Sequence, residues 1–284
     1  MSRVAYVGGQ YLPHRQAAVH IEDRGYQFGD GVYEVIAVVR GVLVDEDRHL
    51  ARLHRSLTEL RINPPMGDGA LKIVMREVIR RNGVNTGIVY LQVTRGVAPR
   101  DHAFPKAAKP VLVVTSRRSR PADPRLGRDG IAVITIRDIR WQRCDIKSVA
   151  LVANVLGKQQ AREAGAYEAW QIDREGQVTE GTSTNAWIVT SDNTVVTRAA
   201  DHAILNGVTR AAIFDIMHRE GYRLVERSFT VEEAKAAREA FLTSTTADLL
   251  PVVRIDGDPV ADGQPGPLSR KLREAYLVHA AAAA

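Results

Sequence analysis

A stretch near the middle of the chain, residues 117–130, contains two prolines, two glycines and five arginines and shows no apolar periodicity. Such a composition is typical of a boundary between domains, because few packing contacts cross a segment of this kind. At 284 residues the chain is long enough for two domains. We therefore expect a small N-terminal domain over residues 1–118, an interdomain linker over residues 119–128 and a larger C-terminal domain over residues 129–284.

Both halves of the chain combine strand-like alternation with helical periodicity. In the first half, the expected elements are a hairpin around Gly8 and Gly9, strands over 31–40, 88–95 and 110–115, and helices over 47–60 and 68–82. In the second half, they are strands over 131–136, 167–172, 186–190, 194–197 and 223–227, and helices over 148–164, 210–220 and 269–279. Strands that follow one another with helices between them predict an α+β fold.

The net charge of +6 and the pI near 9.6 raise the question of a nucleic-acid partner. The arginines are spread among 33 acidic residues, and the densest basic run, Arg117–Arg120, has no interleaved aromatic residues to stack on bases. We therefore expect no nucleic-acid partner. No apolar run approaches a membrane span and the N-terminus shows no signal region, so we expect no membrane association and a cytoplasmic location. The single cysteine, Cys144, excludes an internal disulfide and fits a reducing compartment.

Lys147 is unusual among the seven lysines of the chain, because it alone opens a long apolar stretch, residues 148–157. A lysine beside apolar residues loses hydration, which favours the neutral amine that attacks carbonyl groups. Arginine stays protonated and has no such use. Lys147 is therefore a candidate Schiff-base lysine for a carbonyl substrate or for pyridoxal phosphate. Its position alone favours a lysine that caps a strand end and extends to water. Cys144 is either a reactive thiol or, as we expect, a small packing residue near Lys147.

Bound pyridoxal phosphate needs a phosphate site, and the chain has no Gly-Lys-Ser/Thr loop of the nucleotide-binding type. Residues 206–210 run directly into a predicted helix, whose free N–H groups can bind an anion. Residues 243–246, Thr-Ser-Thr-Thr, offer hydroxyls and amides after a predicted strand. Both patterns are common in proteins without a phosphate. The pyridine nitrogen needs a carboxylate, and Glu180 is suitable because it lies among small residues, although an ordinary hairpin glutamate has the same surroundings.

Six segments of the chain occur in an order that is typical of one enzyme group. They are Arg24–Glu34, Val93–Gly96, Asp138–Ser148, Thr179–Asn185, Gly207–Arg210 and Thr243–Thr246. With these segments the chain closely resembles the fold-type IV (branched-chain aminotransferase-like) pyridoxal-phosphate enzymes, from about residue 3 to residue 275. The resemblance implies pyridoxal 5′-phosphate as cofactor. It also implies a two-domain fold, with a small N-terminal α/β domain and a larger C-terminal β-barrel-like domain with helices.

Within that group the chain is most similar to the D-amino acid aminotransferases, in which an Arg-x-His pair and a tyrosine bind the substrate α-carboxylate. Here the matching residues are Arg100, His102 and Tyr33. The resemblance implies that Arg100 and His102 extend from the neighbouring subunit, so that a homodimer shares its active sites. The planar guanidinium of arginine also suits bidentate binding of a carboxylate.

The same resemblance assigns the cofactor site. It implies that Lys147 forms the Schiff base, that Glu180 pairs with the pyridine nitrogen and that Leu205 flanks the ring. The phosphate-binding residues would be Arg52, Val208, Thr209, Ser244 and Thr245. Tyr90 and His49 match positions with a supporting role, Tyr90 on the substrate side. One departure is the hairpin turn over residues 173–177, which is about one residue longer than the pattern.

The implied reaction is a ping-pong transamination between a D-amino acid, such as D-alanine, D-glutamate or D-aspartate, and a 2-oxo acid, such as pyruvate or 2-oxoglutarate. Lys147 would move the proton of the substrate α-carbon. Branched-chain L-amino acid aminotransferases and aminodeoxychorismate lyases use the same fold, but Arg100 and His102 favour D-amino acids. The alternative from a different class is a basic RNA-binding protein without a cofactor.

Overall fold

The computed structural model describes residues 3–119 and 123–282. The chain divides into two compact units. The first unit contains residues 1–120, 146–150 and 280–284, and the second contains residues 121–145 and 151–279. The segment that carries Lys147 therefore belongs to the first unit, although it is flanked on both sides by residues of the second. Residues 120–122 of the expected linker lie outside the described part of the chain.

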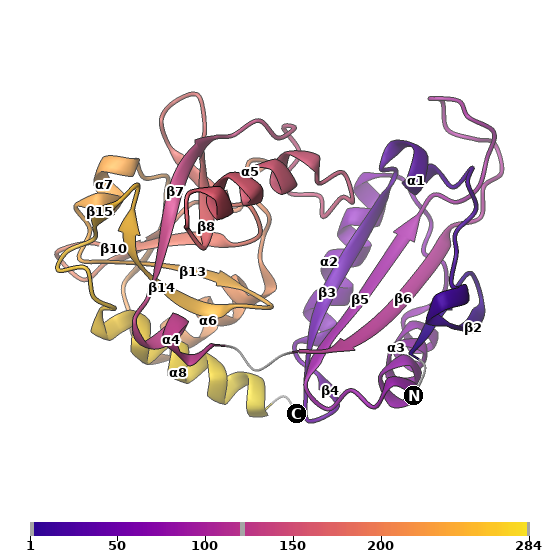
Figure 1. Ribbon diagram of the computed structural model, residues 1–284, viewed down its shortest axis with the longest axis horizontal. Helices are drawn as coiled ribbons and strands as arrows, with labels where there is room; N and C mark the ends of the chain where they lie inside the picture. Colours follow the sequence, from indigo (N-terminus) through magenta and orange to yellow (C-terminus); the bar gives the residue numbers. More distant parts are fainter. Residues whose placement is uncertain (1–2, 120–122, 283–284) are drawn as a thin grey trace. The chain divides into compact units, whose positions relative to one another are not determined.

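The first unit is built on a six-stranded antiparallel sheet with the order β2-β1-β6-β5-β3-β4 (Figure 1). Its strands are β1 (Val4–Val7), β2 (Gln10–Pro13), β3 (Gly31–Val39), β4 (Val42–Leu43), β5 (Gly87–Thr94) and β6 (Val111–Arg118). Its helices are η1 (His14–Gln16), α1 (Arg24–Phe28), α2 (Glu46–Glu59) and α3 (Asp68–Asn82). Leu50, Leu53 and Leu57 recur at helical spacing on α2 and are buried in the core of this unit, which accounts for the packing of α2 on the sheet.

The second unit contains a nine-stranded mixed sheet with the order β12-β11-β10-β13-β14-β7-β8-β9, and β15 pairs with β14. Its strands are β7 (Ile131–Arg137), β8 (Glu168–Ile172), β9 (Val178–Gly181), β10 (Asn185–Val189), β11 (Val195–Thr197), β12 (Leu224–Glu226), β13 (Glu239–Ser244), β14 (Asp248–Ile255) and β15 (Asp258–Pro259). Strand β9, at one end of this order, also packs against β10. The sheet therefore curls, as the larger domain of the fold-type IV enzymes is expected to do.

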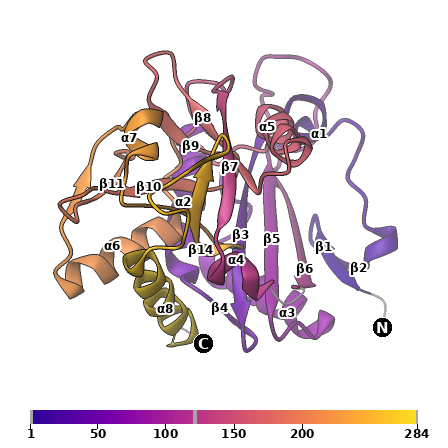
Figure 2. The same ribbon diagram turned by 60° about the vertical axis from the view of Figure 1, so that its left-hand side comes forward.

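The helices of the second unit are α4 (Pro124–Arg128), α5 (Val152–Glu163), α6 (Val208–Glu220), α7 (Val231–Lys235) and α8 (Pro267–Ala282). Helices α6 and α8 lie side by side in both views (Figure 1, Figure 2), and the hydroxyls of Thr209 and Tyr276 are 3.4 Å apart between them. Within the described residues, no helix is long and apolar enough to cross a membrane.

The α+β expectation is confirmed, and one local prediction is wrong. Helix α5 begins at Val152 and not at Ser148, because Val149 donates a hydrogen bond to the carbonyl of Gly31 (3.0 Å) and Val32 forms a β-bridge with Ser148. These pairings hold the segment in an extended form. The expected linker contains the short helix α4, because the side chain of Asp123 caps it by accepting a hydrogen bond from the Arg125 amide and Pro124 occupies its first turn.

Candidate active site

Lys147 lies in the extended segment that pairs with β3, and its backbone is held from two sides. Its amide donates to the hydroxyl of Ser56 on α2 (3.2 Å), and its carbonyl accepts from the amide of Tyr33 (3.0 Å). The amine Nζ is 4.4 Å from the centre of the Tyr33 ring, in cation–π contact. The side chain is half-buried.

Tyr33 and Tyr90, two predicted substrate-binding residues, are brought together by the pairing of β3 with β5. Their rings stack at a centroid distance of 5.8 Å. The hydroxyl of Tyr90 donates to Oε1 of Gln92 at 2.7 Å. Burial, with a smaller effect of Tyr33, raises the pKa of Tyr90 to about 12. Tyr90 therefore keeps its proton at neutral pH and acts as a hydrogen-bond donor.

Arg52, a predicted phosphate ligand, forms a bidentate pair with Glu34, which no sequence pattern had indicated. Nε and Nη2 of Arg52 are each 2.8 Å from one oxygen of the Glu34 carboxylate. Nδ1 of His49 is 2.7 Å from the same carboxylate. Burial alone would raise the pKa of Glu34, but Arg52 and His49 outweigh it and lower the pKa to about 2. The ionised carboxylate thus fixes the plane of the Arg52 guanidinium.

His49 is the third member of this buried group. Its burial lowers its pKa, and the neighbouring Glu34 only partly compensates. The imidazole is therefore neutral at pH 7. Because an ionised carboxylate only accepts hydrogen bonds, we assign the proton of His49 to Nδ1, which faces Glu34. His49 thus supports the Glu34–Arg52 pair.

In the second unit, Glu180 lies at the end of β9 and is 6% exposed. Its Oε2 accepts hydrogen bonds from Nδ2 of Asn185 and from the amide of Leu205, both at 3.1 Å. Its Oε1 accepts a hydrogen bond from the guanidinium of Arg140. Leu205, which was expected to flank the ring, is thus joined to Glu180 through its backbone.

Arg140 is a residue of this site whose role the sequence did not reveal. Its guanidinium also pairs with Asp138, at 2.7 Å between Nη2 and Oδ2, and donates to the carbonyl of Ala203 at 3.1 Å. Burial would lower the pKa of Arg140, but Glu180 and Asp138 raise it above its usual range. Arg140 therefore carries a permanent charge, and this charge favours the ionised form of Glu180.

Asn185 connects Glu180 to the start of α6. Its amide also donates to the carbonyl of Leu205 at 2.9 Å. A Cβ built on Gly207 would lie 2.2 Å from Oδ1 of Asn185, so only glycine fits there. Helix α6 begins directly after Gly207 with the buried residues Val208 and Thr209, and no side chain among the described residues caps it. Its first amides are the kind of donors that bind a phosphate.

Ser244 and Thr245 lie near the same end of the second sheet. Asn185 is the register partner of Thr243 in the pairing of β10 with β13, and Ser244 is the next residue along β13. Helix α6 also packs against β13. The second unit thus gathers the predicted partner of the pyridine nitrogen and most of the predicted phosphate ligands around Asn185 and the start of α6.

Arg100 and His102 lie on the exposed loop between β5 and β6. The guanidinium carbon of Arg100 is 4.7 Å from the centre of the Phe28 ring, and the ring of His102 is 5.5 Å from it. In the described part of the chain, no hydrogen bond or ring contact joins either residue to Tyr33. The structure therefore brings Arg100 and His102 together, but leaves Tyr33 with Lys147.

Cys144 is buried, and its thiol donates to the carbonyl of Trp141 at 3.1 Å. Burial raises the pKa of the Cys144 thiol to about 12, against the opposing effect of Arg140. The thiol is therefore protonated at neutral pH and is a poor nucleophile. This contradicts the alternative of a reactive cysteine.

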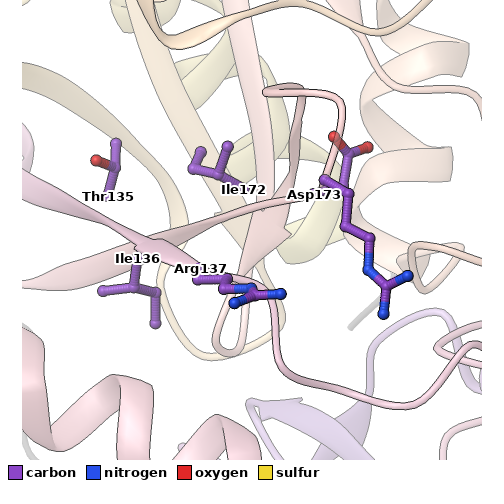
Figure 3. Close-up of a pocket in the computed structure, with 6 residues that line it drawn as sticks. Thr135, Ile136, Arg137, Ile172 and Asp173 are labelled. Carbon is purple, nitrogen blue, oxygen red and sulfur yellow. The ribbon is translucent and has the colours of Figure 1, made fainter.

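Figure 3 shows a depression on the second unit. It has a volume of about 540 Å³ and is lined by Thr135, Ile136, Arg137, Ile172, Asp173 and Arg174. None of these belongs to the predicted site. Asp173 is already engaged, since its carboxylate pairs with Arg198 at 2.8 Å and accepts from the amide of Gln177 at 2.8 Å.

The family model described as amino-transferase class IV matches residues 31–255 of the chain. The D-alanine aminotransferase of Bacillus licheniformis is 42% identical over 268 residues, which cover 94% of this chain and 93% of that protein. Two solved structures have the same fold. The branched-chain amino acid aminotransferase of Escherichia coli has a TM-score of 0.91 at 21% identity, covering 100% of this chain and 96% of that one. A branched-chain amino acid aminotransferase from T.th., solved with pyridoxamine 5′-phosphate, has a TM-score of 0.90 at 26% identity with the same coverage.

Proposed function

The chain belongs to the class IV aminotransferase family, and we propose that it transfers amino groups between a D-amino acid and a 2-oxo acid. It is an aminotransferase that depends on pyridoxal 5′-phosphate. The D-amino acid specificity agrees with the name of the Bacillus licheniformis relative and with the presence of Arg100 and His102 on one loop. D-Alanine with 2-oxoglutarate is the substrate pair that we expect first.

The residues present fit the cofactor. Glu180 is a buried carboxylate next to a permanent cation, so it can hold a proton on a pyridine nitrogen. The contact between Gly207 and Asn185 leaves no room for a side chain at the start of α6, and the amides of Val208 and Thr209 can bind the phosphate together with the hydroxyls of Ser244 and Thr245. We propose cofactor-binding roles for these residues and, within the first unit, for Arg52 and Lys147.

When bound, pyridoxal phosphate supplies an electron-accepting ring that carries the amino group between the two substrates. The position of Lys147 is the main observation in favour of this activity. Ser56 and Tyr33 fix its backbone, and its amine lies at the end of a long side chain, next to the Tyr33 ring. In our scheme the neutral amine of Lys147 takes the proton from the α-carbon of the D-amino acid. In the second half of the reaction it gives a proton to the α-carbon that derives from the 2-oxo acid. Glu180 keeps the ring nitrogen protonated, and Tyr90 stacks on Tyr33 on the substrate side.

The preference for one enantiomer of the substrate depends on which of its groups the enzyme binds. If the amino group and the α-carboxylate of the substrate each have a fixed partner, only one enantiomer can present its α-hydrogen to Lys147. We propose that Arg100 and His102 of the partner subunit in a homodimer hold the carboxylate, with Tyr33. Both residues are exposed, which leaves them accessible to another subunit. A cytoplasmic location is part of the same proposal and is supported by the single cysteine.

Steady-state assays of the cofactor-loaded enzyme test this proposal. Pyruvate formation is measured from D-alanine and from L-alanine with 2-oxoglutarate as acceptor, and glutamate formation is measured from L-leucine. We expect turnover with D-alanine at a kcat/KM at least about 100-fold above that for either L-amino acid, because a misplaced carboxylate loses its charged hydrogen bonds. Efficient use of L-leucine without D-alanine would instead support a branched-chain L-aminotransferase.

A further inference from the structure

The segment Arg24–Asp30, which includes helix α1, contacts the loop that carries Arg100 and His102. The backbones meet first. The amide of Arg24 donates to the carbonyl of Gly96 at 2.9 Å, and Asp23 forms a β-bridge with Val97. The base of the loop is therefore tied to the residues just before and within α1, all of them in the first unit.

The side chain of Arg24 adds contacts farther along the loop. It is 3% exposed, and its Nη1 donates to the carbonyl of Asp101 at 2.6 Å, while Nη2 donates to the carbonyl of His102 at 3.4 Å. Nε is bound to Oδ2 of Asp30 at 2.8 Å, and Asp30 also pairs with Arg95. Burial opposes ionisation of Asp30, but the two arginines hold its pKa below the usual range. The charge of Arg24 is thus fixed next to the loop carbonyls.

Phe28 supports the side chains of the loop. Its ring centre is 4.8 Å from the guanidinium carbon of Arg24 and 4.7 Å from that of Arg100, and 5.5 Å from the ring of His102. One aromatic ring therefore contacts both residues of the Arg-x-His pair. The backbone that follows α1 turns sharply at Gly29, whose φ of 69° favours glycine, so the position of Phe28 is set by the local chain path.

We propose that Arg24 and Phe28 are positioning residues that hold Arg100 and His102 in the orientation that binds the substrate α-carboxylate. This inference rests on the proposed function of Arg100 and His102. The physical reason is that an exposed arginine samples many rotamers, and a binding site gains affinity when its groups are ordered before the substrate arrives. Arg24 fixes the loop backbone, and Phe28 restricts the two side chains.

The first test compares Phe28→Leu with Phe28→Tyr and with a control, Phe104→Leu. Phe104 lies on the same loop and contacts Arg61 and Arg95, but not Arg100 or His102. We expect Phe28→Leu to raise the KM for D-alanine about two- to fivefold, the size of a cation–π contact near the surface, with kcat and the dissociation constant of the cofactor unchanged. Phe28→Tyr keeps the aromatic face, so its KM for D-alanine should equal that of the wild type. The control Phe104→Leu should also have the wild-type KM.

The second test uses Arg24→Lys in the cofactor-loaded enzyme. Lysine keeps a cation beside Asp30 but cannot donate to both loop carbonyls, so we expect a KM for D-alanine raised about tenfold, and faster amide hydrogen exchange in the peptide that covers residues 97–104. The exchange measurement needs no substrate, so it tests whether Arg24 supports the loop even if the enzyme does not use D-alanine. Faster exchange together with no turnover of D-alanine would mean that only the proposed function is wrong. If the wild-type enzyme uses D-alanine, an unchanged KM in both Phe28→Leu and Arg24→Lys would overturn the inference. Losses in kcat and in cofactor affinity as large as the change in KM would also overturn it.

Discussion

The amine of Lys147 is 4.4 Å from the centre of the Tyr33 ring, and the amide of Tyr33 donates to the carbonyl of Lys147. The two residues are thus fixed to one another through backbone and side chain, although they lie far apart in the chain. The ring attracts the protonated form of the amine without forming an ion pair.

Replacing Lys147 with arginine should abolish transamination, by at least about 10⁴-fold in kcat, because a guanidinium stays protonated and cannot accept the substrate proton. Arginine preserves the positive charge and the contact with Tyr33, so the fold and the melting temperature should change little. Rates of pyruvate formation from D-alanine and thermal melts measure the two effects.

Lys158→Arg is the matched control. Nζ of Lys158 is 4.7 Å from the centre of the Tyr167 ring, a geometry close to that of Lys147 and Tyr33. Since we assign no chemistry to Lys158, the control should keep wild-type kcat. Equal kcat values for Lys147→Arg and Lys158→Arg would mean that Lys147 takes no part in the reaction.

Replacing Arg100 with leucine should raise the KM for D-alanine roughly 10- to 100-fold, the usual size of hydrogen bonds to a charged group. The cofactor should still bind normally, because no cofactor ligand is proposed on this loop. KM, kcat and cofactor titration give the comparison, with Arg137→Leu on the second unit as a control for the loss of one exposed positive charge. A KM within twofold of the wild type would contradict the carboxylate role.

Replacing Arg140 with leucine should lower the free energy of unfolding by about 3–5 kcal/mol, because it leaves Asp138 and Glu180 without their shared cation. Arg143→Leu serves as the control. Arg143 is three residues away and pairs with Asp145 at 3.0 Å, with its side chain 35% exposed. Urea unfolding of both variants measures the difference, and an equally small loss in each would mean that Arg140 does not support Glu180.

The buried Glu34 should give the stability of the protein a distinct pH dependence. A pKa lowered from 4.5 to about 2 corresponds to about 3 kcal/mol of stability. Because the pKa in the folded state is the lower one, this stability is present above about pH 4.5 and is lost as the pH falls toward 2. The difference in unfolding free energy between wild type and Glu34→Gln should therefore be constant from pH 7 to pH 5 and shrink below pH 4.5.

Glu77 provides the comparison for this experiment. Its pKa is also lowered to about 2, by Arg80 and Arg81, but its side chain is 24% exposed on α3, whereas Glu34 is fully buried. Solvent and salt screen such pairs, so Glu77→Gln should show no comparable pH-dependent loss. If both glutamine variants behave alike, burial of the Glu34–Arg52 pair does not control the acid sensitivity.

Much of the secondary structure follows from local patterns. The leucines of α2 and the alternation of β3 are visible in the sequence, and both elements occur where periodicity predicts them. Strand β14 has no counterpart among the predicted elements, since Pro251 argues against a central strand. The structure accommodates Pro251 because β14 begins to pair with β7 only at Val252, one residue later.

The candidate site shows a similar division. Lys147, Glu180 and the phosphate segments could be predicted because each has a local signature and a fixed order along the chain. The pairs Glu34–Arg52 and Arg140–Glu180 join residues 18 and 40 positions apart, and only the pairing of strands and helices brings them together. The predicted start of α5 at Ser148 was wrong for the same reason, because Ser148 pairs with Val32 of β3 and the helix begins only at Val152.

The visible spectrum of the cofactor-loaded enzyme during a half-reaction shows directly whether the protein transaminates D-amino acids. D-Alanine is added without a 2-oxo acid, with L-leucine and L-glutamate in parallel samples, and the pyruvate released is counted against enzyme sites. We predict that D-alanine alone bleaches the cofactor band and releases one pyruvate per site, and that Lys147→Arg does neither. Bleaching by L-leucine or L-glutamate but not by D-alanine would contradict the D-amino acid specificity. A protein that binds no pyridoxal phosphate would contradict both the cofactor site and the aminotransferase activity.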